Sequence, residues 1–359
     1  MKKKIAILTQ PLGMNYGGIL QNYALQKILE KMGHDPITIN RWTNHNVSPL
    51  RVALYYFKIE NTVYRKTFNF LKKHVALTGK IDSDQKIITH FRDFKYDAVI
   101  VGSDQTWRPK MSPNIYNYFL DFLQGKDSSN IKKIAYATSF GTSDWEFTAE
   151  QTNKIKVLIK QFDSISVREN TGVDLCKEFL GTDVQHVLDP TMLLSSNDYD
   201  QIFANKKYPD NKGIFAYVLD RNNENDLIIN KISSYFKKDI FRNQAQYSIS
   251  KKQKSKKYPA LETWVKSFSD ADFIITDSFH GTVFSILYKK PFVTIVNKNR
   301  GAARFYSLLE PLGLQMRLVE SEDHVTSVLL NQIIDFKSVS DKLEILKENS
   351  LSFLQKSLT

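Results

Sequence analysis

Short apolar runs alternate with longer amphipathic stretches along most of the chain. The runs are rich in β-branched side chains and end in polar residues, as is typical of strands buried on both faces. The clearest helical pattern covers residues 19–32, in which Leu20, Ala24 and Ile28 recur at helical spacing. The predicted strands are residues 5–8, 37–39, 98–101, 134–137, 165–167, 214–219, 273–276 and 292–296.

This βαβ rhythm predicts an α/β protein with mostly parallel sheets covered by helices on both faces. A chain of 359 residues, 42% of them hydrophobic, is long enough for two such doubly wound domains. The apolar run at 187–194 and the polar stretch at 195–212 indicate the passage between them. We therefore expect an N-terminal domain at 1–195, a C-terminal domain at 196–340 and a closing amphipathic helix at 341–359.

The composition narrows the class of protein. The one cysteine, Cys176, excludes an intramolecular disulfide and suits a reducing compartment. The basic start at residues 2–4 precedes an apolar run that is too short for a signal peptide. No window is apolar for long enough to span a bilayer. We therefore expect a cytoplasmic protein.

The formal net charge of +12 leaves nucleic acid, anionic lipid and small anions open as partners. The densest basic run is 251–257 (KKQKSKK), which lies between predicted elements and contains no aromatic residue. We interpret it as a solvated loop rather than as a nucleic-acid patch, because a block of charge is a weak motif by itself.

Polar residues follow five of the predicted strands. In open parallel sheets, ligands bind beyond the carboxyl ends of the strands, so we expect these residues to meet at one cleft. This convergence indicates a site more strongly than any single motif does. The segments are 9–18, 102–105, 168–170, 276–281 and 297–300.

The segment 276–281 (TDSFHG) indicates an anion site. Asp277 or Ser278 is placed to cap a following helix, and His280 would then lie in the first turn of that helix. Free backbone N–H groups and the helix dipole make such a turn a site for phosphate or carboxylate. The alternative is a histidine that packs at a domain interface.

Arginines near the strand ends are natural partners of such an anion, since a guanidinium matches the oxygens of carboxylate and phosphate. Arg168 and Arg300 are the first candidates, and Arg304 is a third, four residues beyond Arg300. Arg168 could instead pair with neighbouring Glu169, and Arg300 could be an ordinary surface charge.

Asp104 follows a predicted strand, within the segment 102–108 (GSDQTWR). We predict that its carboxylate acts as a general base towards a sugar hydroxyl, with Gln105 and Trp107 lining the sugar site. The alternative is a cap for a short following helix. The loop at 15–18 contains two consecutive glycines, which would let the backbone approach a ligand closely.

Several other chemistries find no support. The seven histidines have no metal-ligand spacing, and one cysteine cannot build a zinc site. Asp82 and Asp84 could hold a divalent cation, but they are remote from the predicted strand ends. The chain has no P-loop, no complete GxGxxG and no GxSxG motif. We therefore expect neither a metal nor a cofactor.

Together, these segments resemble the polysaccharide pyruvyl transferase family. The resemblance spans nearly the whole chain in family order, and TDSFHG and GSDQTW are its most specific parts. It implies two Rossmann-like domains that face each other across a cleft, like those of type B glycosyltransferases. The matching segments are 15–33, 96–107, 134–141, 164–170 (SISVREN), 188–194 (LDPTMLL) and 272–292.

The resemblance also implies an activity. Pyruvate would pass from phosphoenolpyruvate to two hydroxyls of a sugar as a cyclic ketal, with release of phosphate. It implies that Arg168, His280 and a downstream arginine hold this donor, and the downstream arginine would be Arg300 or Arg304. We add Ser278 to the donor site. His280 would also protonate the donor or stabilise the departing phosphate.

The acceptor is expected in the N-terminal domain, with Asp104 as the base. It would be a saccharide or a lipid-linked oligosaccharide of a bacterial cell-surface polysaccharide, such as a capsule or exopolysaccharide. A lipid-linked acceptor would bring the enzyme to the inner face of the membrane, where the basic residues at 2–4 and 251–257 could contact anionic lipid. The expected acceptor-binding residues are Asn15, Tyr16, Gly17, Gln105 and Trp107.

Two other functions stay open. A nucleotide-sugar glycosyltransferase of the same architecture would need a ribose pocket, usually with an acidic residue, and Glu262 is not clearly placed for that role. A non-catalytic protein that binds anions or nucleic acid would tolerate the net charge and would show a steep salt dependence. The scattered basic residues and the acids near the strand ends argue against the second function.

Overall fold

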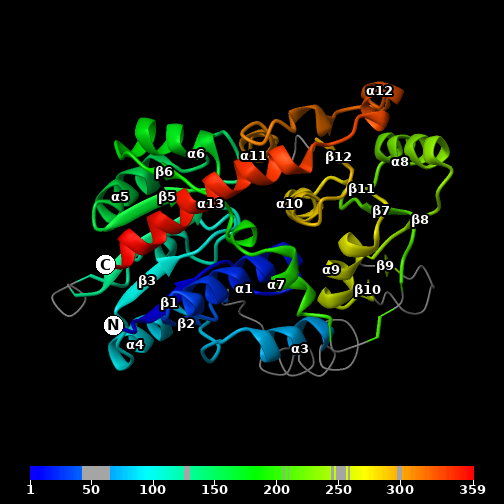
Figure 1. The fold of residues 1–359 in the computed structure, drawn as a ribbon. Coiled ribbons are helices and arrows are strands. Elements are labelled where there is room, and N and C mark those ends of the chain that lie inside the picture. The colour runs from blue at the N-terminus through cyan, green and yellow to red at the C-terminus, as the bar shows by residue number, and fades with distance from the viewer. Residues whose placement is uncertain are drawn as a thin grey trace. The chain divides into compact units, whose positions relative to one another are not determined.

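The computed structural model describes residues 1–42, 65–124, 130–204, 207–208, 210–243, 246–247, 256–257, 259–296 and 301–359. Two compact units make up the chain (Figure 1). Unit 1 comprises Met1–Ser48, Phe70–Leu193 and Ile345–Thr359, and unit 2 comprises Pro49–Asn69 and Leu194–Glu344. We expected the boundary after residue 195, and the contacts place it after Leu193. The C-terminal segment, expected as a separate closing element, belongs to unit 1 from Ile345 onwards.

Unit 1 is built on a six-stranded, all-parallel sheet of order β2-β1-β3-β4-β5-β6. Ile5 of β1 lies opposite Pro36 of β2 on one side and Ala98 of β3 on the other. The strand order reverses between β1 and β3, and ligands bind at such a switch point in open α/β sheets. The strands are β1 (Lys4–Leu8), β2 (Asp35–Thr38), β3 (Ala98–Val101), β4 (Lys132–Thr138), β5 (Ser164–Val167) and β6 (Gln185–His186).

Helices cover both faces of this sheet. On one face, alternate strand residues such as Ala6 and Val99 form a core with residues of α4, α5 and α6. On the other face, the ring of Tyr136 packs 6.1 Å from that of Phe353 on α13, which is why the end of α13 is part of unit 1. The helical segments are α1 (Tyr16–Lys31), α4 (Asp84–Asp93), η2 (Ile115–Phe119), α5 (Ala149–Ile159), α6 (Asn170–Leu175), η4 (Cys176–Leu180) and η5 (Pro190–Leu193). Two further helices, α3 (Arg65–His74) and α13 (Phe336–Leu358), begin in unit 2 and end in unit 1.

Unit 2 has a five-stranded parallel sheet of order β13-β12-β11-β7-β8, so its strands follow the same sequence of crossovers as the first five of unit 1. The order reverses between β7 and β11, where Ala216 lies opposite Ile275. A second, antiparallel pair joins β9 to β10. The strands are β7 (Ile214–Tyr217), β8 (Ile240–Phe241), β9 (Gln246–Tyr247), β10 (Lys256–Lys257), β11 (Phe273–Thr276), β12 (Phe292–Ile295) and β13 (Leu318–Val319).

The two faces of this second sheet differ in chemistry. Aliphatic residues of α8 and α12 form a core with one face. Aromatic rings cover the other face. There, the ring centroid of Trp264 on α9 lies 5.2 Å from that of Tyr217 and 5.1 Å from that of Phe284 on α10. In Figure 1, α8 and the pair α9 and α10 accordingly lie on opposite sides of β7. The helical segments are α7 (Ser196–Asp200), α8 (Asn223–Phe236), α9 (Leu261–Asp270), α10 (Phe279–Leu287), α11 (Ala303–Leu309), η7 (Gln315–Arg317), η8 (Glu322–His324) and α12 (Ser327–Asn331).

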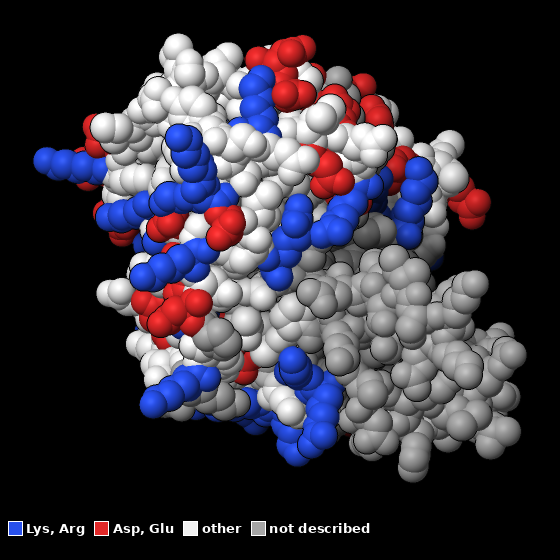
Figure 2. All heavy atoms as spheres, turned by 90° about the vertical axis from the view of Figure 1, so that its right-hand side faces the viewer, with Lys and Arg blue, Asp and Glu red and all other residues white. Residues whose placement is uncertain are grey.

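The charged surface has no single sign on the face drawn in Figure 2, where Lys and Arg side chains are spread among Asp and Glu. The basic run at 251–257 lies mostly outside the described residues. Its last two residues, Lys256 and Lys257, form β10 rather than the expected loop, because their backbone pairs with β9. Within the described part of the chain, no helix is both long and apolar enough to cross a bilayer.

Candidate functional site

The loops that follow β1 and β3 meet at the switch point of unit 1. Asn15 precedes α1 as its N-cap residue, and Asp104 comes three residues after β3. The side-chain amide of Asn15 donates a hydrogen bond to Asp104 Oδ2 at 3.2 Å. The backbone N–H of Gln105 donates to Asp104 Oδ1 at 2.9 Å. The structure thus brings three of the predicted site residues together.

The Asp104 carboxylate approaches the first turn of α1 closely because this turn contains two glycines. A Cβ atom on Gly18 would stand 2.9 Å from Asp104 Oδ2, closer than real side chains come. The N–H groups at the start of a helix and the positive end of its dipole favour a carboxylate at this position. We predicted that the glycine loop would admit a ligand, and here it admits a carboxylate of the protein itself.

Two residues at this edge of the sheet have left-handed backbones, with φ of +73° at Asp104 and +52° at Ala137. Ala137 lies where the pairing of β4 with β5 shifts in register, which is a β-bulge. Such strain persists only where the surrounding contacts enforce it, and it is common at functional sites. Asp104 is followed by turns rather than by a helix, so the alternative prediction of a helix cap is wrong.

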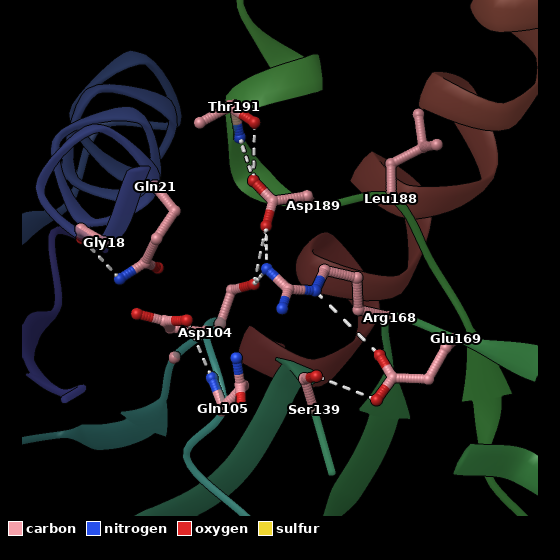
Figure 3. Close-up of polar contacts among 12 residues, drawn as sticks. Gly18, Gln21, Asp104, Gln105, Ser139, Arg168, Glu169, Leu188, Asp189 and Thr191 are labelled. Atoms are coloured by element: carbon pink, nitrogen blue, oxygen red, sulfur yellow. Dashed lines mark hydrogen bonds and ion pairs between the residues drawn. The ribbon is translucent and has the colours of Figure 1, made fainter. Parts of the chain in front are cut away.

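Arg168 follows β5 and lies among these loops (Figure 3). Its side chain is 1% exposed, with Nη1 2.6 Å from Asp189 Oδ2 and Nε 3.9 Å from Glu169 Oε2. Burial lowers the pKa of the guanidinium, but the carboxylates of Asp189 and Glu169 raise the pKa by more, so it ends above its usual value. Arg168 therefore keeps its charge in the interior. The predicted pair with Glu169 is present, but Asp189 is the closer partner.

Asp189 also fastens two other loops. Its Oδ2 accepts a hydrogen bond from the hydroxyl of Ser103 at 2.9 Å. Its Oδ1 accepts from the backbone N–H of Thr191 at 2.9 Å and from the Thr191 hydroxyl at 2.6 Å. The loop after β3 and the turn η5 are therefore joined through one buried carboxylate, as Figure 3 shows.

Glu169 fastens the loop after β4. Its Oε1 accepts from the hydroxyl of Ser139 at 2.8 Å and from the backbone N–H groups of Phe140 and Gly141 at 2.9 and 3.1 Å. Three donors from a single loop thus satisfy one oxygen of a fully buried carboxylate, and the other oxygen, Oε2, lies 3.9 Å from Arg168 Nε.

We did not predict a role for Asp189, Ser103 or Ser139. The pattern at residues 187–194 predicts a passage out of the first domain, but Asp189 faces the other strand ends. The available signal was the aspartate followed two residues later by a threonine, a spacing typical of a turn in which the carboxylate accepts a backbone N–H.

The remaining residues predicted for the acceptor occupy different environments. Trp107 is 0% exposed, stacks on Phe119 with ring centroids 4.9 Å apart and donates to the carbonyl of Tyr118 at 3.0 Å. This burial does not fit the predicted sugar contact, because a satisfied core indole has no free face. Tyr16 and Gly17 are buried in the first turn of α1.

Gln105 lies at the edge between the loops after β3 and β4. Its Oε1 accepts from Arg108 Nη1 at 2.9 Å and would stand 2.5 Å from a Cβ on Gly141. Arg108 is in turn held by Glu146 through two hydrogen bonds at 2.9 and 3.1 Å. Gln105 is half-buried, so part of its side chain is exposed to solvent beside these two loops.

In unit 2, the segment 276–281 lies at the β7/β11 switch point. Ser278 is the N-cap of α10, and its Oγ accepts from the backbone N–H of Gly281 at 3.3 Å. Asp277 instead accepts from the N–H groups of Leu219 and Asp220 at 2.7 and 2.9 Å, which joins the loops after β7 and β11. Of the two predicted candidates, Ser278 is therefore the one that caps the helix. His280 lies in the first turn of α10, as predicted.

The start of α10 lies unusually close to β11. A Cβ atom on Gly281 would collide with Oγ1 of Thr276. That hydroxyl cannot easily move, since it donates to the carbonyl of Tyr217 at 2.7 Å and accepts from the N–H of Ser278 at 3.1 Å. Glycine at 281 is thus required for the helix to begin at this place.

Arg304 on α11 lies beside the first turn of α10. Its Cζ is 5.9 Å from the ring centroid of Phe279, whose ring is in turn 5.3 Å from that of His280. Both Arg304 and His280 are 8% exposed. Arg300, the other predicted donor arginine, lies outside the described residues.

The acidic pair suggested as a cation site has other partners. Asp82 accepts from Lys86 at 2.7 Å, and Asp84 accepts from the buried Arg41 at 2.7 Å. Among the residues that the structure describes, no group of three or more His, Cys, Asp or Glu side chains is arranged to hold a metal ion.

The sequence matches a family model described as "Polysaccharide pyruvyl transferase" over residues 15–299. The chain belongs to this family. The match runs from the N-cap of α1 to beyond β12, so it includes the loops after β3 and β5 in unit 1 and after β7 and β11 in unit 2. It confirms the resemblance noted above. Membership in the family makes the protein a transferase. A comparison with curated proteins finds no match.

Solved structures share the fold of this pyruvyl transferase family member. The alignment with the structure of S. aureus MnaA in complex with UDP covers 96% of this chain and 91% of MnaA, with 15% sequence identity and a TM-score of 0.52. The alignment with UDP-GlcNAc 2-epimerase of Methanocaldococcus jannaschii covers 97% of this chain and 100% of the epimerase, with 15% sequence identity and a TM-score of 0.52. The alignment with Arabidopsis thaliana UGT89C1 in complex with UDP-L-rhamnose covers 100% of both chains, with 10% sequence identity and a TM-score of 0.51. These identities show the fold alone, and the predicted GT-B-like class with two Rossmann-like domains is confirmed.

Proposed function

We propose that the protein transfers pyruvate from phosphoenolpyruvate to a saccharide as a cyclic ketal, with release of phosphate. The observation that supports this most is the first turn of α10, where Ser278, His280 and Arg304 are gathered at the switch point of unit 2. Phosphoenolpyruvate carries a phosphate and a carboxylate. A helix N-terminus beside an imidazole and a guanidinium suits both groups.

The donor chemistry follows from these groups. Protonation of the methylene carbon of phosphoenolpyruvate makes C2 electrophilic, and one sugar hydroxyl adds there. The C2–O bond to phosphate then breaks, phosphate leaves with the bonding electrons, and the second hydroxyl closes the ketal. His280 supplies the proton or stabilises the departing phosphate, and Arg304 or Arg300 offsets its charge.

The acceptor chemistry is assigned to unit 1. Asp104 accepts the proton of the attacking hydroxyl, while Asn15 holds its carboxylate in place. Asn15, Gln105 and the backbone of Tyr16 and Gly17 remain the proposed acceptor contacts. The acceptor is a saccharide or a lipid-linked oligosaccharide of a cell-surface polysaccharide, and the reaction takes place in the cytoplasm or at the inner face of its membrane. The net charge of +12 favours encounter with an anionic donor.

A nucleotide-sugar glycosyltransferase is the second candidate. It is favoured by the names of the structural neighbours, which include complexes with UDP and UDP-L-rhamnose. The two functions differ in the donor, so donor binding separates them.

The first experiment is calorimetric titration of the protein with phosphoenolpyruvate and, separately, with UDP. We expect saturable binding of phosphoenolpyruvate, weakened by about ten-fold or more in His280→Ala and Arg304→Ala, as loss of a charge-assisted hydrogen bond predicts. Arg92→Ala is the control, because Arg92 is exposed and pairs only with its neighbour Asp93 among described residues. Binding of UDP without binding of phosphoenolpyruvate would transfer the assignment to glycosyl transfer.

The acceptor is then sought with a panel of galactosides, mannose derivatives and N-acetylated sugars. Phosphate release in the presence of phosphoenolpyruvate identifies turnover, and the new methyl signal of the ketal in the proton NMR spectrum identifies the product. Phosphate release without a ketal methyl signal would contradict pyruvyl transfer to the sugar.

A further inference from the structure

Helix α3 carries positive charge that the protein does not neutralise. Its ten residues include four cations and no acid, and all four side chains are exposed. Within the described part of the chain, none of the four forms an ion pair with a carboxylate. By contrast, Lys27 on α1 is paired with Glu30, and Arg92 on α4 with Asp93. The unpaired cations are Arg65, Lys66, Lys72 and Lys73.

The two faces of α3 differ in what they contact. On the inner face, the ring of Phe70 lies 5.9 Å from that of Tyr23 on α1 and 4.7 Å from that of His74 (Figure 1). Residues three and seven apart share a face of a helix. The outer face therefore consists of two exposed rows, Arg65–Phe68–Lys72 and Lys66–Asn69–Lys73. Although α3 begins in unit 2 and ends in unit 1, one continuous helix sets the spacing of its own side chains.

Phe68 lies in the middle of this outer face, one turn from Arg65 and one turn from Lys72, and it is 62% exposed. A single exposed apolar residue is ordinary by itself. An aromatic ring among unpaired cations fits a membrane surface, where the cations meet anionic headgroups and the ring enters the boundary between headgroups and acyl chains. We call these five residues the α3 patch: Arg65, Lys66, Phe68, Lys72 and Lys73.

Nucleic acid fits the α3 patch less well than lipid does. Proteins that bind single strands combine a positively charged groove with aromatic side chains on which successive bases stack. The outer face of α3 is convex, about 15 Å long, and offers one ring. A lipid surface needs neither a groove nor a second ring.

The α3 patch also lies near the proposed acceptor site. Phe70 packs on Tyr23, which follows Tyr16 by seven residues, or about 10 Å along α1. Asn15 and Asp104 meet at that first turn of α1. A saccharide linked to a lipid cannot move far from the headgroups, so its enzyme needs an acceptor site close to the membrane.

We propose that the α3 patch docks the protein reversibly on the anionic surface of a lipid bilayer. This inference rests on the proposed function for its use, because a lipid-linked acceptor would give the contact its purpose. The apolar face of α3 is occupied by α1, so attachment depends on charge and one ring and requires anionic lipid. We predicted lipid contact at residues 2–4 and 251–257, and α3 is a separate basic segment.

The first measurement is co-sedimentation of the whole protein with vesicles. We expect binding to phosphatidylcholine mixed with phosphatidylglycerol, no binding to phosphatidylcholine alone, and weaker binding at high salt. Each basic residue near an anionic surface contributes about five-fold, so Lys72→Gln/Lys73→Gln should weaken binding about 25-fold. Glutamine forms helices about as well as lysine, so α3 should persist.

The matched control is Lys156→Gln/Lys160→Gln, which removes the same charge from the exposed side of α5. Neither lysine forms an ion pair with a described residue. We expect binding within about three-fold of the parent, since a general effect of net charge is the only one left. Melting temperatures and the affinity for phosphoenolpyruvate should match the parent in both double variants, which shows that the fold is intact.

The second measurement reports the depth of Phe68. Cys176 is 0% exposed, and burial raises the pKa of its thiol, so a dye added to Phe68→Cys reacts at position 68. An environment-sensitive dye there should shift to the blue on anionic vesicles and be quenched by brominated lipid. Val157→Cys on α5 is the control, because Val157 is 65% exposed and its dye should not respond.

Three outcomes would overturn the inference. One is absence of binding to anionic vesicles in the parent, and another is equal weakening by the α3 and α5 double variants. The third is binding of a single-stranded oligonucleotide that depends on Lys72 and Lys73 while the dye at position 68 stays unchanged on vesicles, which would assign the α3 patch to nucleic acid. Absence of phosphoenolpyruvate binding in the parent would contradict the proposed function instead, and the vesicle data would still decide whether the α3 patch binds lipid.

Discussion

Asp104 Oδ2 lies 3.2 Å from the side-chain amide nitrogen of Asn15, at the start of α1. Asp104→Asn keeps the size of the side chain and tolerates the left-handed backbone, but it removes the carboxylate that accepts a proton. We expect turnover to fall about 10²–10⁴-fold, the usual contribution of a general base. The affinity for phosphoenolpyruvate should be unchanged. Phosphate release and calorimetry measure the two effects.

Asp104→Ala is the companion variant, because alanine is disfavoured at positive φ. It should lose about 1–2 kcal/mol in the free energy of unfolding relative to Asp104→Asn, as urea titration would show. Full activity of Asp104→Asn would exclude Asp104 as the base.

Gly18→Ala should separate stability from activity. Alanine is preferred to glycine in helices by up to about 1 kcal/mol, so the protein should be as stable as the parent or slightly more so. The added Cβ would lie 2.9 Å from Asp104 Oδ2, and the end of that side chain has to move away. We expect at least about a ten-fold loss of turnover, since small displacements of a catalytic group are costly.

Gly79→Ala is the control for this change, because nothing lies within 4 Å of its added Cβ. Melting temperature and phosphate release are measured on both variants. An active Gly18→Ala protein would show that the carboxylate has room to work from a second position.

His186 should make stability depend on pH. Its Nε2 donates to the carbonyl of Arg168 at 3.0 Å, and burial lowers its pKa below the usual 6.5. Below pH 6.5 the unfolded chain binds a proton that the folded chain resists. The contribution of His186 to the free energy of unfolding is therefore complete above its unfolded pKa and declines as pH falls towards the folded pKa, by up to about 1.4 kcal/mol per pH unit.

The measurement is urea unfolding of the parent and of His186→Gln between about pH 5 and pH 8. The difference between the two should be constant near pH 8 and should move in favour of His186→Gln below pH 6.5. His34 and His90 also have lowered pKa values, but both proteins contain them and their effects cancel. A difference independent of pH would contradict the assignment.

Gly281→Ala should damage the donor site of unit 2. The added Cβ meets the hydroxyl of Thr276, which is held by two hydrogen bonds, so the start of α10 has to shift. We expect a loss of about 1–3 kcal/mol in the free energy of unfolding, as for overpacking, together with loss of phosphoenolpyruvate binding. Calorimetry on folded protein tests this, again with Gly79→Ala beside it. Retained binding would move the donor away from this turn.

Much of the fold was predictable because its longer strands are buried on both faces. Continuous apolar runs result, and the predicted limits of β3 and β11 agree with Ala98–Val101 and Phe273–Thr276. The two-residue strands β6, β8 and β13 were missed, since two residues contain no period and their pairing depends on the neighbouring strand. The start of α1 at Tyr16 was missed by three residues, because glycines at 17 and 18 are poor helix formers.

The local parts of the site were also predictable. A cap residue two positions before His280 indicates a helix start, and the structure has it there. The ion pair of Arg168 with Asp189 depends on side-by-side strand ends that are 21 residues apart in the chain, so local patterns contain no sign of it. Trp107 was wrongly predicted to line the sugar site for another reason. Tryptophan occurs both in protein cores and in sugar-binding sites, and only the packing of the folded protein, in which Trp107 is fully buried, distinguishes the two.

The position of α13 affects the order in which the protein can fold during its synthesis. Ser350 accepts from the N–H of Leu188, and Leu354 is fully buried, so the sheet of unit 1 lacks part of its cover without Ile345–Thr359. That segment leaves the ribosome only after all of unit 2 has been made. N-terminal domains usually fold first during translation. In this protein, the half of the chain that is translated first is the last to be finished.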